Sequence, residues 1–131
     1  MRLRLLEALF VLCLCHGILL VAGDVGTAIT YNPPYLPTKC KGADPLQFPE
    51  SGLFVAASEG IWDNGAACGR RYYVRCVSGR KRPCKEGTIV VQVVDLCRAE
   101  RCPATIVLSH RAFQSISKIP SSKISIEYTQ I

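Results

Sequence analysis

The spacing of its cysteines constrains this chain more than any other feature. Of the eight cysteines in the sequence, Cys13 and Cys15 lie in an apolar N-terminal stretch. The other six are Cys40, Cys68, Cys76, Cys84, Cys97 and Cys102. Small residues precede Cys68, and an aromatic, β-branched run precedes Cys76. This pattern is typical of a disulfide-pinned loop that leads into a strand.

The first 23 residues have the features of a secretory signal peptide. Arg2 and Arg4 precede an apolar run that ends in small residues at 21–23, which is the order of a cleaved leader. The alternative is a membrane anchor, but that needs about 20 uninterrupted apolar residues, and Glu7 and His16 interrupt this run. We therefore expect cleavage after Gly23, secretion to the extracellular space without membrane insertion, and a single domain over residues 24–131.

The six remaining cysteines favour disulfides over a metal centre. An even number of cysteines in a small secreted chain is typical of a disulfide framework, and spacing alone does not select the pairing. Beyond the leader the sequence has one histidine, His110, and no paired C-x-x-C motif, so zinc ligation is not indicated. We expect three disulfides, no metal and no cofactor.

Short apolar or alternating segments predict six strands and one helix. The strands are expected at 26–31, 53–57, 72–77, 88–94, 104–108 and 123–128, and the helix at 110–117 with Ser109 as its N-cap. Segment 88–94 is almost continuously apolar, which predicts a central strand covered on both faces. Because so small a chain has no helices to cover an open sheet, the pattern predicts a closed, all-β barrel with one short helix.

Basic residues are the clearest surface signal. Two groups stand out: Arg80, Lys81, Arg82 and Lys85 in one predicted hairpin, and Arg70, Arg71 and Arg75 in or beside the strand before it. One interpretation is a solvated surface; the other is a surface that attracts an anionic partner. Nucleic acid is not expected as that partner, because aromatic residues are not interleaved with these cations as stacking platforms.

With these elements in order, the chain resembles the plant natriuretic peptide proteins, a small expansin-like group with a family-45-endoglucanase-like domain, and especially the citrus blight-associated proteins. The matching segments are GTAITY at 26–31, NPPY at 32–35, WDNGAACGRRY at 62–72, VVDLC at 93–97 and LSHRAF at 108–113. The resemblance implies a six-stranded double-psi β-barrel. The more distant expansins further imply the pairs Cys40–Cys68, Cys76–Cys84 and Cys97–Cys102.

The same resemblance argues against catalysis. Related endoglucanases and expansins carry an aspartate in the segment before the helix, where this chain has Val107, and expansins have a cleft threonine where it has Ile29. Tyr31 and Asp95 do match the family pattern. Glycoside hydrolysis needs two carboxylates, so we expect no enzyme activity. Asp95 is interpreted either as a cleft carboxylate or, preferably, as a turn residue that caps backbone amides.

The function implied by the resemblance is that of an extracellular signal of the apoplast, acting as a monomer on water and solute homeostasis through a cell-surface receptor. The segment credited with signalling in that family corresponds roughly to 31–72. The alternatives are a module that binds or loosens cell-wall polysaccharide, including anionic polysaccharide, and a stress or defence protein of the barwin and kiwellin type. Candidate binding residues are the two basic groups with Tyr31, Asp95 and Trp62, the last expected to be partly buried.

Overall fold

The computed structural model describes residues 23–98 and 100–131. The predicted signal peptide, apart from Gly23, lies outside these residues. The first strand begins at Asp24, the residue after the predicted cleavage site. Within the described part of the chain, no helix is long and apolar enough to cross a bilayer.

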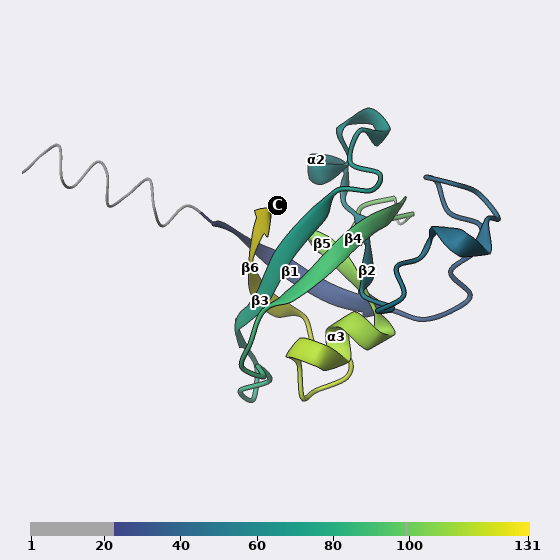
Figure 1. The fold of residues 1–131 in the computed structure, drawn as a ribbon. Coiled ribbons are helices and arrows are strands. Elements are labelled where there is room, and N and C mark those ends of the chain that lie inside the picture. Colours follow the sequence, from purple (N-terminus) through teal and green to yellow (C-terminus); the bar gives the residue numbers. More distant parts are fainter. Residues whose placement is uncertain (1–22, 99) are drawn as a thin grey trace, which may run out of the picture.

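Six strands close into a barrel, as the sequence predicted (Figure 1). They are β1 (Asp24–Tyr31), β2 (Phe54–Ala57), β3 (Arg71–Gly79), β4 (Ile89–Leu96), β5 (Ile106–Ser109) and β6 (Ile124–Gln130). Around the barrel the order is β1-β5-β2-β4-β3-β6. The pairs β1/β5 and β2/β4 are parallel, and the other four pairs are antiparallel.

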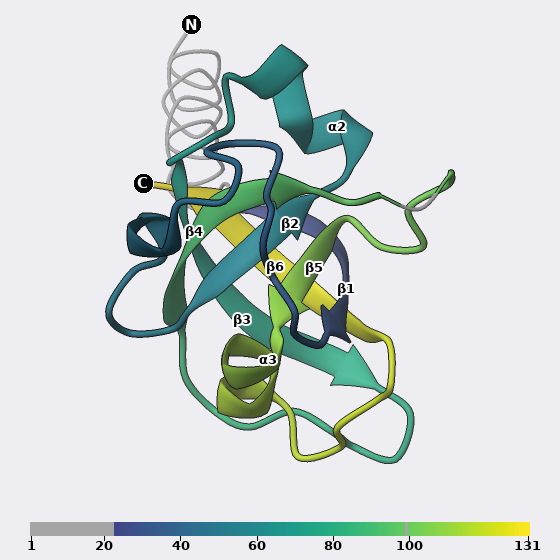
Figure 2. The same ribbon diagram turned by 90° about the vertical axis from the view of Figure 1, so that its right-hand side faces the viewer.

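The core fills the barrel with side chains from alternate positions of the strands. Those fully buried include Ala28, Val55, Val74, Val91, Leu108 and Ile126. Helix α3 (His110–Ile116) lies against one end of the barrel (Figure 2) and buries Ala112, Phe113 and Ile116. Ser109 Oγ accepts a 3.2 Å hydrogen bond from the Ala112 amide, so the predicted N-cap is confirmed.

Two predictions about local structure were incomplete. Between the strands expected at 53–57 and 72–77, where no helix was expected, lie a second short helix, α2 (Glu59–Trp62), and a 3-10 turn, η2 (Asp63–Gly65). The loop after β1 also holds a 3-10 turn, η1 (Pro45–Gln47). Elements of one turn are too short to produce a hydrophobic period, so the sequence pattern did not show them.

The prediction that β4 is covered on both faces was wrong for its first half. Val90 is 38% exposed, whereas Val94, near the other end, is buried. A closed barrel covers only the inner face of each strand, and the outer face is buried only where a loop crosses it. Val94 lines a small hollow together with Cys40 and Cys68, so the segments that carry these cysteines lie beside it there.

Three disulfides fasten the loops outside the barrel. They join Cys40 to Cys68, Cys76 to Cys84 and Cys97 to Cys102, the same pairs that the expansin resemblance implied. The first ties the loop before β2 to the segment before β3. The second closes the β3–β4 connection, and the third closes the β4–β5 loop.

Candidate functional site

Four neighbouring strands bring one row of side chains together on the outside of the barrel. The strand register pairs Ile29 with Val107, Val107 with Ala56, and Ala56 with Asp95. Directly paired residues point to the same face of a sheet. The core is built from the residues between them, so this row faces outward.

A β-bulge sets the position of Asp95 in this row. The register between β2 and β4 shifts between Val55, which pairs with Val93, and Ala56, which pairs with Asp95. The extra residue on β4 is Val94. Because a bulge re-aims the side chains that follow it, Asp95 comes to lie opposite Ala56.

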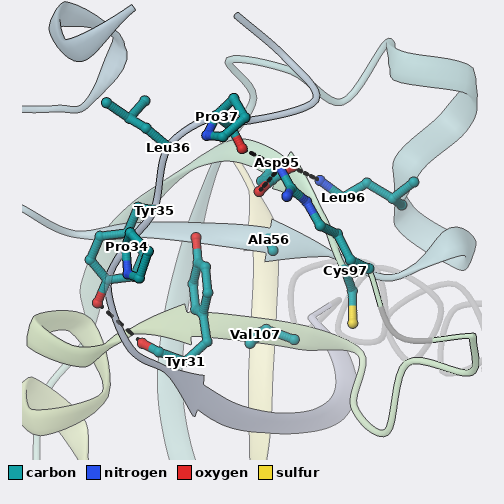
Figure 3. A pocket seen from close by; sticks show the side chains of 11 residues that line it. Tyr31, Pro34, Tyr35, Leu36, Pro37, Ala56, Asp95, Leu96, Cys97 and Val107 are labelled. Atoms are coloured by element: carbon teal, nitrogen blue, oxygen red, sulfur yellow. Dashed lines mark hydrogen bonds and ion pairs between the residues drawn. The ribbon is translucent and has the colours of Figure 1, made fainter. Parts of the chain in front are cut away.

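The loop that follows β1 crosses this row and encloses a cleft of about 190 Å³ (Figure 3). Its lining comes from β1, β2, β4 and β5, from the loop after β1 and from the start of the β4–β5 loop. The lining residues are Tyr31, Pro34, Tyr35, Leu36, Pro37, Ala56, Asp95, Leu96, Cys97, Arg98 and Val107.

Tyr31 belongs to an aromatic cluster centred on Tyr35 and Phe54. Its ring lies edge-on to those of Tyr35 and Phe54, with centroids 4.9 Å and 6.4 Å away, and Phe54 packs on Phe48 at 4.6 Å. Tyr35 is itself held in place, because its hydroxyl donates to the Tyr31 carbonyl at 3.1 Å and accepts from the His110 amide at 3.1 Å. Rigid aromatic walls therefore form this side of the cleft.

The Tyr31 hydroxyl is buried and makes no hydrogen bond within the described residues. Figure 3 shows it directed toward the middle of the lining residues. Burial raises the pKa of the Tyr31 phenol above its ordinary value, and the charge of Asp95 raises it further. The phenol stays protonated at neutral pH, and its hydroxyl keeps an unused capacity to donate and accept a hydrogen bond beside the cleft.

Asp95 is the carboxylate of the cleft, and it is already engaged by the protein. Its Oδ1 accepts from the backbone amides of Lys39 at 2.8 Å and Leu96 at 2.9 Å, and its Oδ2 lies 3.7 Å from Arg98 Nη2. Arg98 also donates to the Pro37 carbonyl. Asp95 thus lies in a cleft and also caps backbone amides, which were the two interpretations of its sequence position.

The other candidate residues lie apart from the cleft. Trp62 belongs to α2 and is partly buried against the core. Arg70 forms an ion pair with Asp63 at 2.8 Å, and Arg75 with Glu127 at 2.9 Å. Arg71 is exposed near the start of β3, and Arg80, Lys81 and Arg82 are exposed beyond its end. The candidates therefore do not form one site.

Of the lining residues, only Tyr31 and Asp95 were chosen as candidate binding residues from the sequence, and three other lining residues were among those missed. Tyr35 and Pro37 come from the loop after β1, and Arg98 follows Cys97. The NPPY segment that carries Tyr35 was recognised only as a matching motif. The one signal for Tyr35 in the sequence was an aromatic residue beside two prolines. Tyr35 and Asp95 are far apart in sequence, so the sequence did not indicate that they line the same cleft.

Comparisons with known proteins agree with the barrel fold. Residues 55–128 match the family profile described as lytic transglycolase, a double-psi β-barrel. An EG45-like domain containing protein from Citrus jambhiri is 42% identical over 110 residues, covering 80% of this chain and 79% of that protein. EG45-like domain containing protein 2 from Arabidopsis thaliana is 38% identical over 109 residues, covering 81% of this chain and 79% of that protein.

Two solved structures of the expansin of Clavibacter michiganensis are also similar. The apo form has a TM-score of 0.62 at 25% identity, and a point mutant in complex with cellohexaose has a TM-score of 0.64 at 26% identity. Each match covers 84% of this chain and 50% of the expansin. The chain therefore spans half the length of these expansins.

The closed six-stranded barrel, the profile match and the similarity to the expansin structures define an expansin-like protein with a double-psi β-barrel. Within that class, the chain belongs to the family of EG45-like domain containing proteins.

Proposed function

We propose that this protein binds a polysaccharide chain of the plant cell wall along the cleft and does not cleave it. The observation that carries the proposal is the row in which Asp95 and Val107 are both paired with Ala56. Two strand spacings separate their backbones by about 10 Å. Inverting glycosidases hold their carboxyl groups about 6.5–9.5 Å apart. Val107 thus occupies a position from which a second carboxylate could act, and a valine cannot transfer a proton.

The state of Asp95 also argues against catalysis. A general base must be able to accept a proton from a water molecule or a sugar hydroxyl. One oxygen of Asp95 already accepts two backbone amides, and the other faces Arg98. We infer that Asp95 shapes the cleft rather than driving a reaction in it.

Binding is supported by the aromatic wall and the unpartnered hydroxyl. Tyr31 and Tyr35 present apolar faces with polar ends, a combination suited to a sugar ring and its hydroxyls. The related Clavibacter expansin was solved with cellohexaose, which supports a β-linked glucan as the class of ligand for this chain.

Calorimetric titration with cellohexaose tests this proposal. We expect Tyr31→Phe to weaken binding about tenfold, because it removes one buried hydrogen bond of about 1.4 kcal/mol to the ligand. Tyr73→Phe is the matched control, since Tyr73 is exposed on β3 outside the cleft. Wild-type protein that binds neither cellohexaose nor cellulose would refute the proposal.

A second candidate is the extracellular signal in water and solute homeostasis. One observation favours it: the segment about 31–72 includes a long surface loop that presents Leu46 on η1, where this apolar side chain is 89% exposed. Exposed loops held on a rigid scaffold are frequent recognition elements. The partner would be a cell-surface receptor.

One preparation of secreted protein can separate the two candidates. Pull-down onto isolated cell walls reports polysaccharide binding, and protoplast swelling reports signalling. We expect wall binding that is reduced by Tyr31→Phe. Swelling without wall binding, lost on Leu46→Ser, would favour the signal instead.

A further inference from the structure

Two loops carry the whole net positive charge of residues 24–131. They are residues 80–88 between β3 and β4, and residues 117–123 between α3 and β6; together they are named the basic platform. The platform holds Arg80, Lys81, Arg82, Lys85, Lys118 and Lys123, with Glu86 as its one carboxylate. Residues 24–131 have 14 Lys and Arg and 9 Asp and Glu; outside the platform eight of each remain, so the rest of the domain is neutral.

The two loops are joined into one surface. The Lys85 amide donates to the Ile116 carbonyl at 2.9 Å, and the Lys118 amide donates to the Pro83 carbonyl at 2.7 Å. Gly79 pairs with Ile124 in the sheet, Pro83 is fully buried, and the Cys76–Cys84 disulfide closes the first loop. Cations more than 30 residues apart in sequence are thus held on a common frame.

All six cations are exposed, and none of them forms an ion pair with another described residue. Elsewhere in the structure Arg70, Arg75 and Arg98 each face a carboxylate. Uncompensated charges of one sign on a single surface produce a positive potential that attracts anions.

The tip of the first loop keeps its cations at a conformational cost. Lys81 and Arg82 have φ values of 63° and 50°. Left-handed backbone costs a residue with a side chain about 1–2 kcal/mol, and glycine or asparagine normally takes such positions. Two consecutive basic residues at these positions therefore destabilise the loop. Retained strain of this kind is frequent where a residue contacts a partner, which favours a binding role for the two charges.

The platform is separate from the cleft. It adjoins Ile89 at the start of β4, whereas Asp95 lies near the end of that strand. Six residues of strand span about 20 Å. Figure 2 shows α3 and the loop before β6 together at the lower end of the barrel, away from the β4–β5 loop.

The chemistry of the platform restricts its partner. None of the large apolar side chains exposed in the described part of the chain lies in either loop, so the apolar contact that helps basic segments hold a membrane is missing. Neither loop contains an aromatic residue on which a nucleic-acid base could stack. What remains is a set of cations with serine hydroxyls beside them at Ser121 and Ser122. We propose that the basic platform is a second binding surface of this protein, which takes a polyuronate chain such as demethylated pectin independently of the cleft.

Binding of the purified protein to polygalacturonate, measured in low salt, tests the platform. Fully methyl-esterified polygalacturonate is the matched ligand, because it has the same backbone without the charge. We expect binding only to the charged form, with weakening as salt rises. Lys81→Gly/Arg82→Gly should weaken it about thirtyfold, since each cation near a polyanion contributes about fivefold. Its melting temperature should equal or exceed that of wild type, because glycine adopts positive φ freely.

Lys39→Ser/Lys41→Ser is the charge-matched control, because it removes two exposed cations of the loop after β1 that belong neither to the platform nor to the lining of the cleft. This control should change the affinity for polygalacturonate by less than about twofold, because distant charges are screened. Tyr31→Phe should leave the affinity for polygalacturonate unchanged. Equal loss in the control, or full binding by the platform variant, would overturn the proposal. So would platform-dependent binding to phosphatidylserine vesicles without binding to polygalacturonate, which would assign the surface to a membrane.

Discussion

The backbone amide of Lys39 donates a 2.8 Å hydrogen bond to Asp95 Oδ1, a contact between residues 56 positions apart in sequence. It fastens the loop that forms one wall of the cleft to the end of the strand that forms its floor. The adjacent Leu96 amide donates to the same oxygen at 2.9 Å. The cleft therefore depends on Asp95 for its shape.

Asp95→Ala should lower the free energy of unfolding by about 3 kcal/mol, because two partly buried amides lose a charged acceptor. Asp95→Asn keeps one acceptor oxygen, so its free energy of unfolding should fall by only about 1 kcal/mol. Asp44→Ala is the control, since Asp44 accepts one amide, from Leu46, on the surface; its loss should be about 1 kcal/mol or less. Chemical denaturation measures all three. Full stability of Asp95→Ala would show that Asp95 is free to act on a ligand.

The buried phenol of Tyr31 predicts a decline of stability in alkali. Unfolding returns its raised pKa to about 10. Above that pH the unfolded chain loses a proton that the folded protein retains, so the unfolded state is favoured and stability falls as pH rises. In Tyr31→Phe the decline should be shallower, although Tyr128, whose pKa is also raised by burial, still contributes. Thermal unfolding between pH 8 and about 11 measures the slope. Identical slopes in wild type and Tyr31→Phe would contradict the burial of this hydroxyl.

Peptide mapping without reduction should find Cys76 joined to Cys84. The loop that this disulfide closes spans a sequence separation of 8, for which the loop-entropy relation gives about 2.5 kcal/mol. Cys76→Ala/Cys84→Ala should lose stability by about that amount and also weaken binding to polygalacturonate, because the basic platform loses its anchor. Cys76 linked to any other cysteine would refute the pairing.

Cellulose and xylan should yield no reducing sugar on incubation with the protein, since Val107 stands where a proton donor is needed. Val107 is only 5% exposed, so Val107→Asp should cost about 3 kcal/mol by burying an unpaired carboxylate. Val107→Ile is the apolar control for this position. Reducing sugar released by wild type and abolished by Asp95→Asn would establish a hydrolase instead.

Secreted protein should begin at Asp24, because the charge, apolar core and small residues before it follow the order of a cleaved leader. The same residue starts β1, whose first paired residue is Asp24 with Tyr128, so cleavage there leaves the barrel complete. Intact-mass measurement of the secreted product gives the result. A mass that includes residues 1–23 would contradict cleavage.

Much of the barrel could be predicted because its determinants are local. Alternation along 72–77 and 123–128 separates a buried face from an exposed one, and Ser109 caps α3 through an amide only three residues away. The exceptions were elements of a single turn, such as α2, and the outer face of β4 at Val90. Single-turn elements are too short to show a hydrophobic period. The burial of the outer face of β4 depends on whether a loop distant in sequence covers the strand.

By itself, the sequence determined the six strands, the presence of six cysteines beyond the leader and the absence of a carboxylate at Val107, since each follows from residue identity or local periodicity. Only the tertiary structure decided which residues share a surface. Strand order placed Val107 between Ile29 and Ala56, and a bulge at Val94 turned Asp95 into the same row. Closure of the barrel likewise joined Lys118 and Lys123 to the hairpin cations. Such neighbours come from hydrogen bonds between residues distant in sequence, and no local pattern records them.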